Sequence, residues 1–121
     1  MKVRFTDDSI RMRVRKSDLK QLKAEGQTRT QIQLQPALAF VLTIGDTPTP
    51  TAQMEGSTLT VTLPRTAAQQ WINSEQVGIE HQQKQADGSR IHLLIEKDFP
   101  CAHRPQEDKA DTFEELEEKE N

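Results

Sequence analysis

The chain of 121 residues is poor in cysteine, in aromatic side chains and in long apolar runs. Its single cysteine excludes an intrachain disulfide framework. No apolar run approaches the roughly 18 residues that a membrane helix needs, and no charged start leads into an apolar stretch and a small-residue cleavage site. Apolar residues make up only 33% of the chain, so the expected core is small. We therefore expect one soluble, cytoplasmic domain with no membrane association.

The motifs of common enzyme classes are also missing. The chain contains no G-x-G-x-x-G, no phosphate-binding loop, no G-x-S-x-G and no H-E-x-x-H. Its five aromatic residues are too few to alternate with basic side chains as stacking platforms for single-stranded nucleic acid. The sequence therefore predicts no cofactor and argues against nucleic acid as a partner.

Charge is distributed unevenly along the chain. Residues 106–121 hold eight acidic and two basic side chains, whereas the preceding 105 residues hold 14 basic and 11 acidic ones. Phe113 and Leu116 are the only large apolar residues of this end, too few to offset the entropy of ordering it. We predict a single folded domain over residues 1–104 and a flexible acidic tail over 105–121, of a kind that commonly keeps a protein in solution.

A repeat with an offset of 49 residues is the main architectural signal. Apolar residues alternate with polar ones in both copies, at Ile10, Met12 and Val14 and again at Leu59, Val61 and Leu63. Ser17 and Thr66 follow these strands and are placed as N-caps of short amphipathic helices. Gly26 and Asn73 are placed to end the two helices. Each half therefore reads as ββαββ.

The remaining strands complete this pattern. They are expected at residues 2–5, 28–35, 38–44, 51–55, 77–84 and 90–97, with Phe5, Ile32, Leu34, Val77 and Ile79 pointing inward. The two pseudo-repeats cover residues 1–46 and 51–97, and neither has enough apolar residues to fold alone. We predict an α+β domain of eight antiparallel strands and two short helices. Its strands form either a barrel or two packed sheets related by a pseudo-two-fold axis.

A row of arginines is the most suggestive candidate site. Arg11, Arg13 and Arg15 lie on the face opposite the apolar residues of their strand, and a hairpin would bring Arg4 and Lys2 beside them. Guanidinium groups bind phosphate and carboxylate bidentately. The second copy has threonines at the equivalent strand positions, so the repeat itself does not require the charge. The row is either a binding face for an acidic protein or small anion, or a solvated face whose charges protect an edge strand.

Potential metal ligands are scattered. Cys101 and His103 form a C-x-H pair, but a zinc site takes four ligands at recognised spacings, and the sequence does not complete such a set. His81 and His92 are placed to face each other across the turn of the last hairpin, again without further ligands. The sequence therefore predicts no metal site, with Cys101 and His103 as weak candidates.

Two segments carry a resemblance to a known family. At residues 9–18 (SIRMRVRKSD) and 96–101 (EKDFPC) the chain resembles a functionally uncharacterised family of bacterial proteins of about this length. Residues 104–113 are similar to the closing segment of that family, although Glu114-Glu115-Leu116 follows Phe113 where the family has a proline-containing stretch. The resemblance implies a bacterial origin and a shared fold, and it implies no activity.

We predict from these features a small, non-catalytic binding or adaptor module whose arginine-lined face recognises an anion or an acidic partner. The alternative is an enzyme that acts on a phosphorylated or carboxylated small molecule. The two differ in shape, because the enzyme needs arginines that converge in a concave site, whereas a binding module can use an open face.

Overall fold

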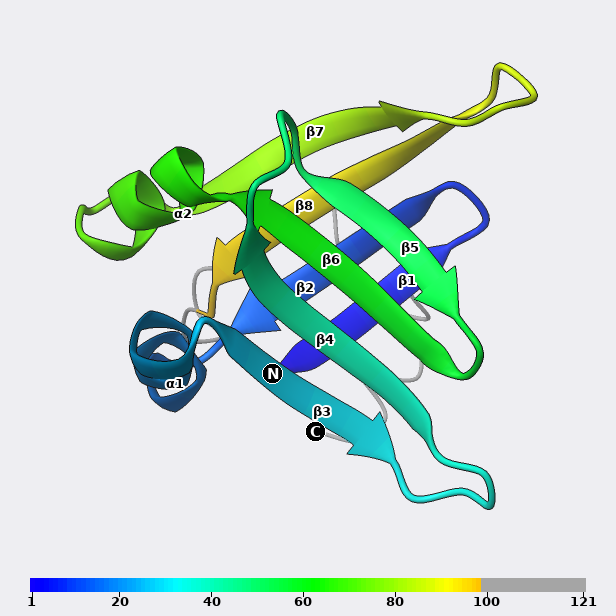
Figure 1. Ribbon diagram of the computed structural model, residues 1–121, viewed down its shortest axis with the longest axis horizontal. Coiled ribbons are helices and arrows are strands. Elements are labelled where there is room, and N and C mark those ends of the chain that lie inside the picture. Colours follow the sequence, from blue (N-terminus) through cyan, green and yellow to red (C-terminus); the bar gives the residue numbers. More distant parts are fainter. Residues whose placement is uncertain (99–121) are drawn as a thin grey trace, which may run out of the picture.

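Two four-stranded sheets and two short helices make up residues 1–98 of the protein (Figure 1). The computed structural model describes residues 1–98. In chain order the elements are β1 (Lys2–Thr6), β2 (Ser9–Val14), α1 (Lys16–Glu25), β3 (Gln27–Ile32), β4 (Leu38–Gly45), β5 (Thr51–Glu55), β6 (Thr58–Pro64), α2 (Arg65–Ile72), β7 (Gly78–Lys84) and β8 (Arg90–Lys97). The predicted α+β class, with eight strands and two helices, is confirmed. The predicted acidic tail lies outside the described residues.

The strand order corrects two details of the prediction. The sheets have the orders β1-β2-β8-β7 and β3-β4-β6-β5, and they do not close into a barrel. Each outer pair is an antiparallel hairpin, but the central pairs β2–β8 and β4–β6 are parallel. An all-antiparallel arrangement was therefore wrong, because each half sends its two hairpins to different sheets and every sheet joins hairpins from both halves. Such long-range pairing leaves no local signal in the sequence.

The two halves are arranged alike. Strands β1–β4 correspond in order to β5–β8, and exchanging each strand for its counterpart converts one sheet order into the other, read in reverse. Within the first hairpins the registers also correspond, since the pair Val3–Met12 becomes Ala52–Val61 when 49 is added to both numbers. Origin by duplication stays a prediction, but this correspondence identifies which residues of the two halves occupy equivalent places.

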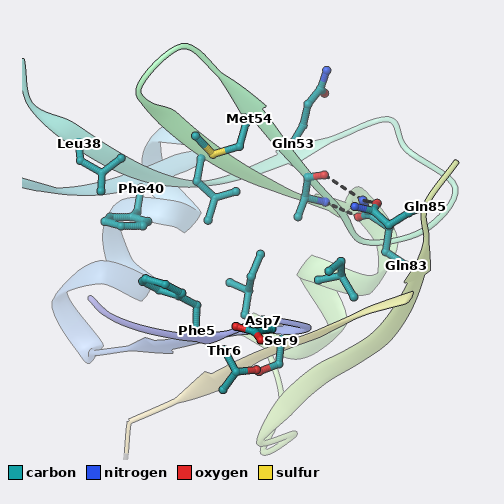
Figure 2. A pocket seen from close by; sticks show the side chains of 14 residues that line it. Phe5, Thr6, Asp7, Ser9, Leu38, Phe40, Gln53, Met54, Gln83 and Gln85 are labelled. Atoms are coloured by element: carbon teal, nitrogen blue, oxygen red, sulfur yellow. Dashed lines mark hydrogen bonds between the residues drawn. The ribbon is translucent and has the colours of Figure 1, made fainter. Parts of the chain in front are cut away.

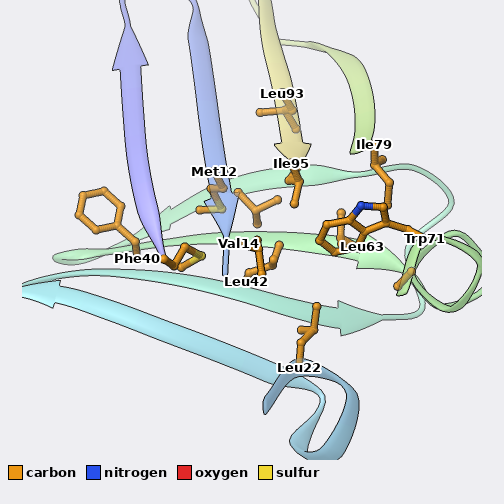
Figure 3. Packing of buried hydrophobic residues seen from close by; sticks show 13 residues of the cluster. Met12, Val14, Leu22, Phe40, Leu42, Leu63, Trp71, Ile79, Leu93 and Ile95 are labelled. Carbon is orange, nitrogen blue, oxygen red and sulfur yellow. The ribbon is translucent and has the colours of Figure 1, made fainter. Parts of the chain in front are cut away.

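The core lies between the sheets and is closed at one end by the helices (Figure 3). The alternating residues Met12 and Val14 of β2 and Val61 and Leu63 of β6 are all at most 2% exposed. Each helix adds one large buried side chain at an equivalent position, Leu22 of α1 and Trp71 of α2. The other two central strands, β4 and β8, add Leu42, Leu93 and Ile95. The period-2 pattern of the sequence therefore identified the buried face of both central strands.

Both helices begin two residues earlier than their predicted caps require. Ser17 and Thr66 lie inside α1 and α2, so their prediction as N-caps was wrong. Asp18 serves the start of α1 instead, because its carboxylate accepts the backbone N–H of Arg15 at 3.0 Å. The predicted ends at Gly26 and Asn73 are confirmed, and Gly26 has the left-handed φ of 80° that glycine accommodates without strain. No helix among residues 1–98 is long and apolar enough to cross a membrane.

Several residues predicted to point into the core are exposed. Phe5 is 71% exposed, Leu34 57%, Val77 49% and Ile32 48%, whereas Ile79 is buried as predicted. Leu34 and Val77 lie outside the strands that were expected to hold them. Phe5 and Ile32 do occupy inward positions of β1 and β3, but they lie toward the end opposite the helices, beyond the close-packed core.

Candidate functional site

The predicted arginine row lies on the outer surface of the β1-β2-β8-β7 sheet. Lys2 and Arg4 of β1 stand directly opposite Arg13 and Arg11 of β2 in the antiparallel register. Like charges placed opposite each other across a strand pair repel and destabilise the sheet. We refer to the surface formed by Lys2, Arg4, Arg11 and Arg13 as the cationic face.

One carboxylate from a distant part of the chain holds two of these arginines. Glu96 of β8 accepts hydrogen bonds at Oε1 from Arg11 Nε at 2.8 Å and Arg13 Nε at 3.1 Å, and Arg11 Nη2 lies 2.6 Å from the same oxygen. The side chains of Arg11, Arg13 and Glu96 are 25%, 12% and 15% exposed. Glu96 therefore neutralises one of two adjacent charges and fixes both guanidinium groups against the sheet.

The accessible part of the cationic face is β1. Lys2 is 63% exposed and its ammonium lies 3.7 Å from the carboxylate of Asp98, a long contact that leaves the amine solvated. Arg4 is exposed and makes no ion pair with any other residue of the 1–98 segment. The cationic face thus combines two held arginines with two exposed cations on an edge strand.

Arg15 does not continue the row. β2 ends at Val14, and Arg15 is the N-cap residue of α1, with its guanidinium 3.5 Å from Asp18. Asp18 also lies 2.8 Å from the N-terminal ammonium group. Burial pushes the pKa of the Asp18 carboxyl upward, but hydrogen bonds from the ammonium group and the Arg15 backbone, together with their positive charges, outweigh it and lower the pKa. This cluster belongs to the helix start and is separate from the cationic face.

The histidines do not form the predicted facing pair. Gln82 pairs with His92 and Leu93 pairs with His81, so the two imidazoles point to opposite faces of the sheet. His92 Nε2 lies 2.5 Å from Glu80 Oε1 on the outer surface. Within residues 1–98 no three potential ligands among histidine, cysteine and acidic residues come together. Cys101 and His103 lie outside the described residues.

A second feature, absent from the sequence predictions, is an apolar cleft between the sheets at the end opposite the helices (Figure 2). The cleft has a volume of about 550 Å³. Its apolar lining comes from both sheets: Phe5, Ile10, Leu38, Phe40, Ala52, Met54, Leu59 and Ile91. A sequence signal existed, because Phe5 and Met54 occupy equivalent positions of the two first hairpins and both are large and apolar.

One side of this cleft is closed by a side chain. The carboxamide of Gln83 in β7 bonds to both backbone groups of Ala52 in β5, accepting the N–H at 2.6 Å and donating to the carbonyl at 3.0 Å (Figure 2). Strands β5 and β7 are edges of different sheets, so this contact ties the sheets together without a shared backbone ladder.

Comparison with known proteins places the chain in a family. The model of DUF7009, a family of unknown function, matches residues 1–117. No curated protein and no solved structure matches the chain. The predicted resemblance to a functionally uncharacterised family is confirmed, and the bacterial origin that it implied stays a prediction.

Proposed function

The chain belongs to this family of unknown function, and from its geometry we propose a non-catalytic binding module that docks an acidic protein on the cationic face. The observation that carries the proposal is the opposition of Arg4 to Arg11 and of Lys2 to Arg13 across β1 and β2. Four cations share this surface with the carboxylates of Glu96 and Asp98, so positive charge remains in excess.

The shape of the surface favours a macromolecular partner over a small anion. The cationic face is the outer side of a sheet, whereas no lysine or arginine of the described residues lines the cleft between the sheets. An extended acidic segment could lie along β1 and reach Lys2 and Arg4, with Arg11 already held in position behind them. Guanidinium groups suit such carboxylates because their planar donors match both oxygens.

The alternative, an enzyme for a phosphorylated or carboxylated small molecule, required arginines that converge in a concave site. Arg11 and Arg13 converge on Glu96, a side chain of the protein itself, on an open surface. The geometry therefore supports the binding module better. A cytoplasmic location and an origin of the two halves by duplication belong to the same proposal.

The test is charge reversal at the exposed cations. The double variant Lys2→Glu with Arg4→Glu should bind a fluorescently labelled poly-glutamate peptide about tenfold more weakly, as measured by fluorescence anisotropy at low salt. Each substitution removes an attraction to the peptide and adds a repulsion. The affinity of the unaltered protein should fall with added salt because exposed charges are screened. Arg11 and Arg13 are unsuitable for the reversal, since new carboxylates there would face Glu96 and unfold the sheet.

A matched control uses one exposed cation on each of two other edge strands, β3 and β7. Arg29 of β3 and Lys84 of β7 are exposed cations outside the cationic face, and reversing both makes the same change in net charge. The control should retain the affinity of the unaltered protein. Equal weakening in both double variants would overturn the proposal, as would a peptide that fails to bind. If the cations of β1 only protected this edge strand from pairing with other chains, glutamates would protect it equally well, and the charge reversal would not change peptide binding.

A further inference from the structure

We propose that the apolar cleft between the sheets binds an uncharged, predominantly apolar small molecule. This site is distinct from the cationic face, which lies on the other side of the β1-β2-β8-β7 sheet. Its volume of about 550 Å³ lies within the range of roughly 300–1,000 Å³ found for small-molecule sites. A pocket of this size between packed sheets differs from an ordinary exposed patch, because a ligand entering it is surrounded by side chains of both sheets (Figure 2).

The apolar lining is built twice, once from each half. Phe5 and Met54 are equivalent, and so are Ile10 and Leu59, each pair being related by the offset of 49 residues. The parallel pairing of β4 begins at Ala39 and that of β8 at His92. Leu38 and Ile91 each lie one residue earlier and therefore form a third equivalent pair. Both halves therefore place apolar side chains at this end, although no close-packed core covers them.

Exposure at the mouth of the cleft is unusual for residues of this kind. Phe5 is 71% and Met54 57% exposed, while Phe40, deeper inside, is 8% exposed. Exposed apolar surface of this extent lowers stability and solubility unless something covers it. A bound apolar molecule would bury Phe5 and Met54 at once, and a phenyl ring and a thioether adapt to ligands of varied shape.

The polar groups of the lining indicate an uncharged ligand. The carboxamide of Gln83 is occupied by Ala52, and the hydroxyls of Thr6 and Ser9 lie 2.6 Å apart and bond to each other. Among residues 1–98, Asp7 is the only charged side chain of the lining, and this part of the chain places no cation there to receive an anionic head group. A carboxylate or phosphate would meet repulsion, whereas an uncharged apolar molecule loses little hydration on entry.

The experiment uses the neutral fluorophore N-phenyl-1-naphthylamine with the full chain. We expect saturable enhancement of its fluorescence at one site per chain, and displacement by 1-decanol at a lower concentration than by decanoate. Phe5→Gln with Met54→Gln should weaken probe binding about tenfold, because the mouth of the cleft loses its apolar lining. Phe5→Leu with Met54→Leu should restore binding, since the lining is again apolar.

Val77→Gln is the control for exposed apolar surface elsewhere, because Val77 is 49% exposed and does not line the cleft. It should leave the affinity unchanged. Absence of saturable binding, equal weakening by Val77→Gln, or stronger displacement by decanoate would overturn the proposal. So would a dimer in sedimentation that the double glutamine variant converts to monomer, because a second copy would then cover the cleft. The circular-dichroism melting curves of all variants establish that each is folded.

Discussion

The two ends of the sandwich use the same sheets in different ways. At the helix end, Leu22 and Trp71 are fully buried among residues from both sheets, and the indole N–H donates to the carbonyl of Val77 at 3.0 Å. At the open end, Phe5 and Met54 occupy inward positions of equivalent strands and remain mostly exposed. Inward orientation therefore buries a side chain only where a helix or a facing strand lies close enough to cover it.

This difference separates stability from binding. Burial of apolar surface and dense packing provide most of the free energy of folding, so the helix end stabilises the domain. The open end leaves apolar surface uncovered and keeps a cleft of about 550 Å³ between the sheets. The comparison can be tested by substitutions that act on one end only.

Trp71→Ala should have the largest effect. Truncation of a fully buried aromatic side chain removes its apolar burial and leaves a cavity, and the Val77 carbonyl keeps only the N–H of Lys97 of its two donors. We expect the free energy of unfolding in urea to fall by about 3–5 kcal/mol. Met54→Ala at the open end should change it by less than about 0.5 kcal/mol, as for other exposed positions. Similar losses in both variants would contradict the division between the ends.

Asp18 provides a smaller, pH-dependent test of the helix end. Its pKa is lowered from the usual 3.8, so its carboxylate stabilises the fold at neutral pH and loses this contribution as the pH falls through the folded-state pKa. Asp18→Asn keeps an oxygen acceptor but removes the charge, and should reduce the free energy of unfolding by about 1 kcal/mol at neutral pH. The two proteins should become equally stable in acid.

Asp87, at the open end, is the control for Asp18, because the pKa of its carboxyl is also lowered. Asp87, in the β7–β8 turn, accepts hydrogen bonds from the Ser89 hydroxyl at 2.6 Å and the Ser89 backbone N–H at 2.9 Å, which lower its pKa. Because Asp87 is in solvent, Asp87→Asn should change the pH dependence of unfolding less than Asp18→Asn does. Parallel pH profiles for the unaltered protein and Asp18→Asn would show that the helix-start cluster does not stabilise the fold.

Local patterns in the sequence predicted much of this architecture. The bounds of β5 and β8 were predicted correctly, because alternation and turn residues act over a few positions. The helix caps failed at Ser17 and Thr66 because other groups serve the helix starts: the Asp18 carboxylate at α1, and at α2 the chain entering through Pro64 with its restricted φ. In both cases the sequence offers several residues within a few positions that could begin the helix, and the pattern did not identify the one that does.

Features that join distant segments could not be predicted in this way. Glu96 lies 83 and 85 positions from Arg13 and Arg11, and only the parallel pairing of β2 with β8 brings them together. Arg11 and Arg13 were correctly placed on the outer side of β2, whereas Arg15 lies beyond the strand as the N-cap of α1. The partner that neutralises Arg11 and Arg13 depended on a sheet order that no local pattern encodes.

A similarly small loss of stability is expected at the contact that closes one side of the open end. Gln83→Leu removes both hydrogen bonds to the Ala52 backbone, and we expect the free energy of unfolding to fall by about 1 kcal/mol. The equivalent position of the first half is Ile32, an apolar residue that cannot make this contact, so the sandwich already tolerates one edge without it. Gln82→Leu, exposed on the opposite face of the same strand, is the control and should leave stability unchanged. A loss of several kcal/mol in Gln83→Leu would mean that the open end depends on one side chain to hold the sheets together, and the helix end would then not be the main source of stability.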